Sequence, residues 1–171
     1  MKIVIVGANQ VGSALAETLS NEKNDITIVD ENSERLQELN DHIDARVVAG
    51  PPSHPATLLS AGADDAEMLI AVTDSDEINM VACRVAHTVF KVHRRICRIR
   101  SSSYTENDKL FCTDGMAADE IIIPEEIVSG YISRLIELPG SLQVLDFADS
   151  RVQLVAVKAF YGGPLVGQEI R

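Results

Sequence analysis

The sequence predicts an α/β protein with a Rossmann-like doubly wound parallel sheet, followed by a partial β-rich start of a second module. Short apolar runs rich in Val and Ile alternate with helical stretches as far as residue 124, and such alternation is typical of parallel sheets. The first run leads into a glycine-bounded loop, and the second ends in a carboxylate. After residue 138 the alternation stops, and two strand-like runs follow one another.

The glycine-bounded loop lies between a predicted strand, residues 2–6, and a predicted helix that includes residues 13–19. Gly7 allows the chain to turn sharply out of the strand, and Gly12 allows the helix to pack close to the sheet. The unpaired amides at the start of the helix can hold a pyrophosphate. The loop residues expected at this phosphate are Gly7, Ala8, Asn9, Gln10, Val11 and Gly12.

Asp30 ends the second predicted strand, residues 25–30. Its carboxylate can accept hydrogen bonds from ribose hydroxyls and would repel a 2′-phosphate, which favours NAD or ATP over NADP. The strand, loop, helix and distal carboxylate together form the dinucleotide-binding βαβ layout. The simpler interpretation of the loop is an ordinary tight turn between a buried strand and a helix.

Asn9 occupies the position of the middle glycine in the G-x-G-x-x-G pattern. Asparagine tolerates positive φ better than most residues, so we expect the turn to be kept. Its side chain is expected to intrude where the backbone should approach phosphate most closely. We therefore expect nucleotide binding to be retained with altered geometry or affinity.

The composition excludes several classes of protein. With 46% hydrophobic and 24% charged residues, the 171-residue chain resembles an ordinary globular protein. Its net charge of −11 disfavours binding to nucleic acid or to an anionic lipid surface. No apolar run approaches the roughly 20 residues that span a bilayer, and Met1 opens directly into a strand, which indicates that there is no signal peptide. Membrane association is therefore expected only through a partner.

The cysteines favour a reduced, cytosolic protein without a structural metal. Cys83, Cys97 and Cys112 are far apart in the sequence and form no C-x-x-C pair. We expect them to be mostly buried thiols.

The remaining segments up to residue 124 continue the alternation. Asn32 and Ser33 can cap a helix, and the Gly- and Pro-rich residues 50–55 predict a loop at the carboxyl edge of the sheet. Further strands are predicted at 45–49, 68–72, 95–100 and 120–123, and further helices at 56–61, 77–90 and 104–112. The helix at 77–90 should pack on the sheet through Ile78, Val81, Ala82, Val85 and Val89.

Arg98 and Arg100 fall on the same side of the strand predicted at 95–100, at its carboxyl end. Two guanidinium groups there are costly unless they meet anions, and nucleotide phosphates are suitable partners. The alternative is pairing with acidic residues of this acidic chain.

The segment after Pro124 predicts an amphipathic helix over residues 125–138. Its apolar stripe is wide enough to contact both its own sheet and a second subunit, although simple core packing is the alternative. The stripe consists of Ile127, Val128, Tyr131, Ile132, Leu135 and Ile136. Residues 139–171 are too few for an independent core and are expected to be the truncated start of a further module, so the expected divisions are 1–124, 125–138 and 139–171.

Taken together, these segments resemble the RCK (also called KTN) domains that regulate potassium transport. The resemblance rests on the glycine loop, Asp30, the Arg98-Ile99-Arg100 strand end, Ile123-Pro124-Glu125, and the run from Gly163 to Gly167. It implies a cytoplasmic, non-catalytic sensor of NAD(H), ATP or ADP that forms a dimer or a larger ring. It also implies a membrane potassium-translocating subunit as partner, which would hold the protein at the inner face of the cell membrane.

The resemblance also implies roles for individual residues. Phosphate falls to the amides of residues 7–12, and ribose to Asp30 and Asn32. Adenine falls near Ala49, Gly50, Thr73 and Asp74, and the distal phosphates fall to Arg98 and Arg100. Glu125 matches a glutamate that some relatives place near a phosphate or cation at the dimer interface. Members of the family continue beyond the equivalent of Arg171, typically with a second sensing unit.

The competing interpretation is the nucleotide-binding domain of an NAD-dependent oxidoreductase. That function needs a proton donor, but the sequence has no Tyr-x-x-x-Lys. Its histidines, His42, His54, His87 and His93, form no recognisable acid–base arrangement with a carboxylate. The sequence therefore favours a ligand-gated switch over an enzyme.

Overall fold

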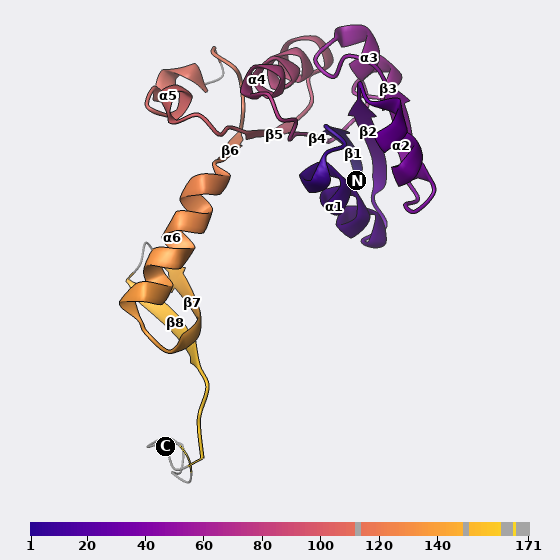
Figure 1. Cartoon of the computed structure of the whole chain (residues 1–171). Coiled ribbons are helices and arrows are strands. Elements are labelled where there is room, and N and C mark those ends of the chain that lie inside the picture. Colours follow the sequence, from indigo (N-terminus) through magenta and orange to yellow (C-terminus); the bar gives the residue numbers. More distant parts are fainter. Residues whose placement is uncertain (112–113, 149–150, 162–165, 167–171) are drawn as a thin grey trace. The chain divides into compact units, whose positions relative to one another are not determined.

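A computed structural model describes residues 1–111, 114–148, 151–161 and 166 of the chain (Figure 1). The chain forms two compact units, which are Met1–Ile123 and Pro124–Arg171. Each unit is described below by itself.

The first unit is built on a six-stranded parallel sheet with the order β3-β2-β1-β4-β5-β6. Strand β1 pairs with β2 on one side and with β4 on the other, so the strand order reverses between β1 and β4. Ligands of open α/β sheets bind at the carboxyl edge of such a reversal. The strands are β1 (Lys2–Val6), β2 (Asp25–Asp30), β3 (Arg46–Ala49), β4 (Met68–Ala71), β5 (Arg94–Arg98) and β6 (Glu120–Ile122).

Helices cover both faces of the sheet, which confirms the predicted doubly wound α/β fold. Figure 1 shows α1 on one face and α4 on the other. Side chains alternate along each strand, so β1 sends Ile3 and Ile5 to one apolar cluster and Val4 and Val6 to the other. The helices of this unit are α1 (Gln10–Asn21), α2 (Ser33–Asn40), α3 (Pro55–Ser60), α4 (Asp76–Val85) and α5 (Ser102–Thr105).

The single helix predicted over residues 104–112 is wrong. The structure has the short helix α5 and then a 3-10 turn, Asp108–Leu110, while Cys112 lies outside the described residues. The residues between are polar and offer no apolar face to bury, so the helix ends after one turn. Phe111 then reaches the core, where it is 7% exposed.

The helix predicted at 77–90 exists, and its predicted packing face is right only in part. Ala82 is buried and Val85 packs against the core, but Val81 and Val89 are exposed. Helix α4 begins at Asp76, and a π-helical turn follows it, Ala86–Phe90. Val81 is 44% exposed and Val89 55% exposed. The residues that α4 and the π-helical turn bury are Asn79, Met80, Ala82, Cys83 and Ala86. The two alanines are small, which allows the helix to approach the sheet closely.

The second unit consists of helix α6 (Pro124–Glu137) and an antiparallel pair of strands, β7 (Ser141–Phe147) and β8 (Val152–Val157). No residue of α6 is buried against the rest of the described chain. Within this unit, Arg134 Nη1 donates a hydrogen bond to Asp146 Oδ2 at 2.8 Å. That hydrogen bond lowers the pKa of the Asp146 carboxyl, and a second one, from Gln153, lowers it further.

Candidate functional site

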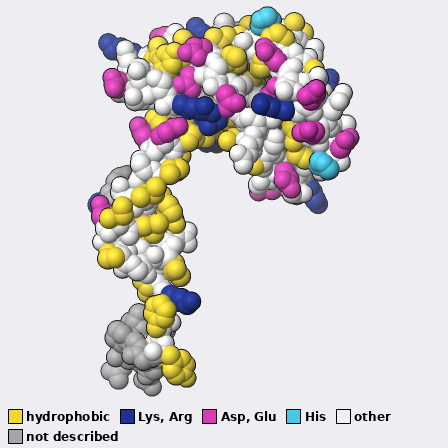
Figure 2. Space-filling model, viewed as in Figure 1, with side chains coloured by type: hydrophobic (Ala, Val, Ile, Leu, Met, Phe, Trp, Pro, Cys, Tyr) yellow, Lys and Arg dark blue, Asp and Glu magenta, His cyan; other side chains and the backbone are white. Residues whose placement is uncertain are grey.

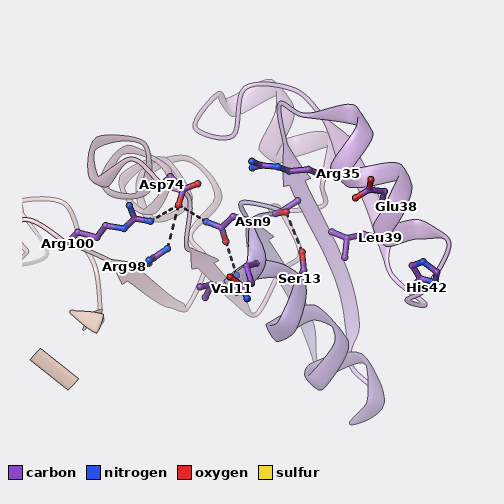
Figure 3. A pocket seen from close by; sticks show the side chains of 12 residues that line it. Asn9, Val11, Ser13, Arg35, Glu38, Leu39, His42, Asp74, Arg98 and Arg100 are labelled. Carbon is purple, nitrogen blue, oxygen red and sulfur yellow. Dashed lines mark hydrogen bonds and ion pairs between the residues drawn. The ribbon is translucent and has the colours of Figure 1, made fainter. Parts of the chain in front are cut away.

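A cavity of the first unit opens at the carboxyl edge of the sheet, between the glycine loop, helix α2 and the end of β5 (Figure 3). Its volume is about 610 Å³, and its lining is Ala8, Asn9, Gln10, Val11, Ser13, Arg35, Glu38, Leu39, His42, Asp74, Arg98 and Arg100. A second cavity of about 310 Å³ shares Asn9, Arg35 and Asp74 with the first. The rest of its lining is Asp30, Glu31, Pro52, Thr73, Ser75 and Ile78.

Gly7 and Gly12 each lie so close to neighbouring backbone atoms that a side chain would not fit there. Gly7 has φ +110°, and a Cβ there would lie 2.9 Å from the amide nitrogen of Thr73. A Cβ on Gly12 would lie 1.8 Å from the carbonyl oxygen of Gly7. The sharp turn and the close helix approach expected from the sequence are therefore confirmed.

Asn9 does not adopt the positive φ for which its tolerance was invoked. Its φ of −74° and ψ of −179° are extended, because Asn9 is the N-cap of α1. Its Oδ1 accepts hydrogen bonds from the amides of Val11 and Gly12, both at 3.1 Å. The side chain thus caps amides that the sequence predicted to be unpaired, and it keeps the loop in one conformation.

Asp30 ties the glycine loop to the end of β2. Its Oδ2 accepts a hydrogen bond from the amide of Ala8 at 2.6 Å, and its Oδ1 accepts one from the amide of Asn32 at 2.8 Å. A carboxylate offers about four acceptor positions, so both oxygens retain capacity for a further donor. Asn32 itself caps α2, where it accepts from the amides of Glu34 and Arg35.

Arg98 and Arg100 both face Asp74, together with Asn9 (Figure 3). Arg100 Nη2 lies 2.6 Å from Asp74 Oδ1, and Arg98 Nη1 lies 3.9 Å from the same oxygen. Asn9 Nδ2 donates to that oxygen at 3.1 Å. The arginines therefore pair with an acidic residue, which was the alternative to phosphate. Among the described residues, however, the buried Nε of Arg98 has no hydrogen-bond partner.

Asn79 holds the walls of the site together from inside the protein. Its side chain is fully buried, and its Oδ1 accepts from the amide of Thr73 at 2.8 Å and from the Thr73 hydroxyl at 2.7 Å. Its Nδ2 donates to the carbonyl of Thr73 at 3.2 Å and to that of Arg98 at 3.0 Å. One amide thus links the loop after β4 to the end of β5. Sequence reasoning missed it, although a polar residue beside Met80, Ala82 and Cys83 was a usable signal.

The backbone that carries Arg100 is fixed in a similar way. The amides of Arg100 and Ser101 donate to the carboxylate of Asp76, at 3.0 Å and 2.9 Å to its nearest oxygen. Strand β5 ends at Arg98 and does not continue to residue 100 as predicted, and Asp76 accepts the amides that follow Ile99.

Beside the site, a network of three side chains fixes the start of α4. The Tyr104 hydroxyl donates to Glu77 Oε1 at 2.7 Å, and the Ser75 hydroxyl donates to Glu77 Oε2 at 2.8 Å. The Tyr104 bond is the main cause of the lowered pKa of the Glu77 carboxyl. Negative charge is favourable at a helix start, so Glu77 also stabilises α4.

The cavities bring together most, but not all, of the residues predicted for the site. Gly7, Gly12 and Asn32 line neither cavity. Ala49 and Gly50, at the end of β3, also line neither, and the Gly50 amide donates to the carbonyl of Asp30 at 2.9 Å. Glu125 belongs to the second unit. The sequence did not predict the α2 side of the larger cavity, formed by Arg35, Glu38, Leu39 and His42. Glu38 and Leu39 follow Arg35 by three and four residues, which puts them beside it on one face of α2 and was a usable signal, whereas His42 lies beyond the end of that helix.

No group of three or more His, Cys, Asp or Glu side chains among the described residues could hold a metal ion. No helix in the described ranges is long and apolar enough to cross a membrane.

Strand order, glycine loop and a carboxylate at the end of β2 define a Rossmann-like domain of the class that binds nucleotides. The model of the TrkA-N domain matches residues 3–124, and the chain belongs to the TrkA-N family. This confirms the resemblance inferred from the sequence.

Two curated relatives are each called Trk system potassium uptake protein TrkA. The protein from Halomonas elongata is 55% identical over 170 residues, and the protein from Vibrio alginolyticus is 57% identical over 171 residues. Each alignment covers 99% of this chain and 37% of the relative. The chain thus spans little more than a third of the length of these relatives.

Solved structures with the same fold are more distant in sequence. The TrkA-N domain of inner membrane protein ybaL from Escherichia coli has a TM-score of 0.67 and 19% identity, covering 80% of this chain and 96% of that one. A GsuK channel bound to NAD has a TM-score of 0.66 and 19% identity, covering 86% and 25%. GsuK bound to ADP has a TM-score of 0.62 and 20% identity, covering 74% and 32%.

Proposed function

We propose that this chain is the nucleotide-sensing part of a cytoplasmic regulatory subunit of a potassium uptake system. It binds NAD(H), ATP or ADP and passes the state of the site to a membrane potassium-translocating partner. The carrying observation is the cavity where the glycine loop, Arg98 and Arg100 meet at the reversal of the strand order. The names of the relatives, and the nucleotides bound to GsuK, support the same proposal.

The proposed pose follows the chemistry of the lining. The ribose hydroxyls donate to the free acceptor positions of Asp30, next to Thr73 in the smaller cavity. The phosphates extend past the loop amides into the larger cavity, where Arg98 and Arg100 supply guanidinium donors that suit phosphate geometry. Distal phosphates therefore distinguish ATP and ADP from NAD(H).

Binding is proposed to act as a signal and not as a step in catalysis. The larger cavity contains one histidine, His42, which lies just beyond the end of the helix that carries Glu38, and His42 makes no hydrogen bond or ion pair to a carboxylate of the described residues. The competing function, an NAD-dependent oxidoreductase, requires a proton donor placed at the substrate. NADH binding without turnover by the chain would support the switch, and NADH consumption with a carbonyl substrate would support the enzyme.

The second unit is proposed to join copies of the chain into a homodimer or a larger ring. Figure 2 shows hydrophobic side chains gathered on the surface of this unit. The α6 residues Ile127, Val128, Ile132 and Ile136 are between 50% and 73% exposed, and an apolar stripe of this kind is typical of an interface. Through α6, the nucleotide state of one chain would reach its neighbour and the membrane partner.

Replacing Arg100 tests the nucleotide site. Arg100→Ala should weaken ATP binding about tenfold, because a charge-assisted hydrogen bond to phosphate is lost, and should change NAD binding less. Calorimetric titration of ATP, ADP, NAD and NADH into the 171-residue chain measures both effects. Arg94→Ala is the matched control, because Arg94 begins β5 and so lies at the opposite end of that strand from the site. Equal losses for ATP and NAD would contradict the role given to Arg100.

A further inference from the structure

We propose that Asp74 is a built-in competitor for the phosphate position and thereby sets the preference of the site for highly charged nucleotides. This inference rests on the proposed nucleotide-binding function and deepens it. The family resemblance implies that Asp74 lies near adenine, whereas its carboxylate meets the groups expected to bind phosphate.

The contacts of Asp74 resemble those of a bound phosphate oxygen. A single oxygen, Oδ1, receives Arg100 Nη2 at 2.6 Å and Asn9 Nδ2 at 3.1 Å. Arg98 Nη1 lies 3.9 Å from it, which is an ion pair but too long for a hydrogen bond. One internal anion thus draws together donors from the glycine loop and from the end of β5.

Asp74 satisfies this set of donors only in part. Arg98 is 12% exposed, and its buried Nε has no hydrogen-bond partner within the described chain. A buried donor without a partner costs free energy. A terminal phosphate has three oxygens and can therefore accept from Arg98 and Arg100 together, which one carboxylate does not do here.

The competitor can leave without disturbing the walls of the site. The side chain of Asp74 is 59% exposed and that of Arg100 is 40% exposed, and exposed ion pairs contribute little to stability. Asn79 and Asp76 hold the backbone on either side through hydrogen bonds that do not involve the Asp74 carboxylate. Asn9 keeps its bond to the carbonyl of Val72 at 2.8 Å. Displacement therefore requires only the side chains to move.

In this arrangement, the affinity of the site for a ligand depends on whether the ligand places a charged phosphate near Arg100. A ligand with no phosphate near Arg100 leaves Asp74 in place, whereas a terminal phosphate must replace it and takes over its donors. Asp74 and that phosphate repel one another, so Asp74 lowers the affinity for ATP and has little effect on adenosine.

Asp74→Asn tests the proposal because the amide keeps the shape and an acceptor oxygen but removes the charge. Calorimetry on the 171-residue chain with ATP, ADP, NAD and adenosine should show ATP binding about tenfold tighter, with the gain reduced at high salt. Adenosine binding should be unchanged. Asp65→Asn is the control for net charge, because Asp65 pairs with Lys2 away from the larger cavity. It should leave all four affinities unchanged.

The outcomes separate this inference from the function on which it rests. ATP binding that is unchanged or weaker in Asp74→Asn, with wild-type binding intact, would overturn the competitor role and make Asp74 a positioning residue. Asp74→Ser, which also removes the charge, must tighten ATP binding in the same way. If neither the wild-type chain nor any variant binds a nucleotide, the proposed function fails, and this inference fails with it.

Discussion

At the scale of single residues, Gly12 shows how a missing side chain determines the fold. The start of α1 approaches the end of β1 so closely that a methyl group on Gly12 would overlap the Gly7 carbonyl. The same approach brings the loop amides to the carboxyl edge, where the cavity opens. Gly12 is therefore needed both for packing α1 close to the sheet and for forming the loop beside the cavity.

Gly12→Ala should destabilise the first unit by about 1–3 kcal/mol or more, because the overlap can be relieved only by moving the backbone. Urea unfolding followed by circular dichroism measures the change. The control is Gly130→Ala in α6, where an added Cβ would have only the end of the Arg134 side chain within 4.0 Å. Since alanine favours a helix interior over glycine by roughly 1 kcal/mol, that variant should be no less stable than the wild type. A neutral Gly12→Ala would contradict the close approach.

Residues whose role depends on backbone conformation were predicted from the sequence. Gly7 and Gly12 needed only the strand-loop-helix pattern, and Asp30 needed only its place at a strand end. Asn9 was predicted less well, because a side chain that caps the helix and also contacts Asp74 depends on a residue far along the chain. Single-sequence patterns carry no information about such partners.

At the scale of elements, the join between β4, α4 and β5 depends on one buried amide. Asn79 contributes four hydrogen bonds to this join, all of them to Thr73 or Arg98. Their effect is to hold two strand ends at a fixed separation beneath the site. Polar contacts therefore hold this join together in addition to the apolar packing of Met80, Ala82 and Cys83.

Asn79→Leu should cost roughly 2–5 kcal/mol of unfolding free energy, because the Thr73 amide and the Arg98 carbonyl lose their buried partner. It should also weaken ATP binding, since the end of β5 is no longer held. Thermal and urea unfolding, with calorimetry on the folded protein, measure the two effects. The control on the same helix is Val81→Ala, which should stay within about 1 kcal/mol of the wild type because Val81 is 44% exposed.

The same helix shows where element prediction fails. The predicted face includes Ala82, which is buried, but also Val81 and Val89, which are exposed, and it omits Asn79, Met80 and Cys83. Hydrophobicity ranks valine above asparagine, so periodicity favours two exposed valines and passes over the buried amide. Strands were predicted more reliably, because a parallel strand buried on both faces needs only a continuous apolar run.

At the scale of the whole molecule, the two units differ in how they are stabilised. The first has two apolar clusters, one on each face of its sheet. The second has an α6 with no buried residue and a strand pair whose side chains are mostly exposed. We therefore expect the second unit to gain stability from contacts with other chains.

Ile132→Glu should shift the chain towards a monomer, because it places a charge within the exposed apolar stripe of α6. Multi-angle light scattering over a range of protein concentrations measures the mass. Ser133→Glu is the control, since this substitution adds the same charge to the same helix but outside the apolar stripe. A wild-type chain that is monomeric at every concentration would argue against the proposed self-association.

The start of α6 was approachable from sequence, because proline is favoured in the first turn of a helix and α6 begins at Pro124. The interface proposed for α6 was not, since an amphipathic helix has the same pattern whether it packs on its own sheet or on another chain. The sequence pattern shows that one face of the helix is apolar, but it does not show which surface packs against that face.

The strand order has a consequence for synthesis on the ribosome. Strand β1 pairs with β2 and also with β4, which begins only at Met68. At about 5–20 residues per second, a nascent chain spends seconds with β1, β2 and β3 able to pair while the other edge of β1 stays open. An open apolar edge invites pairing with other chains. The most buried strand of the finished domain is therefore the one that a translating cell must shield longest.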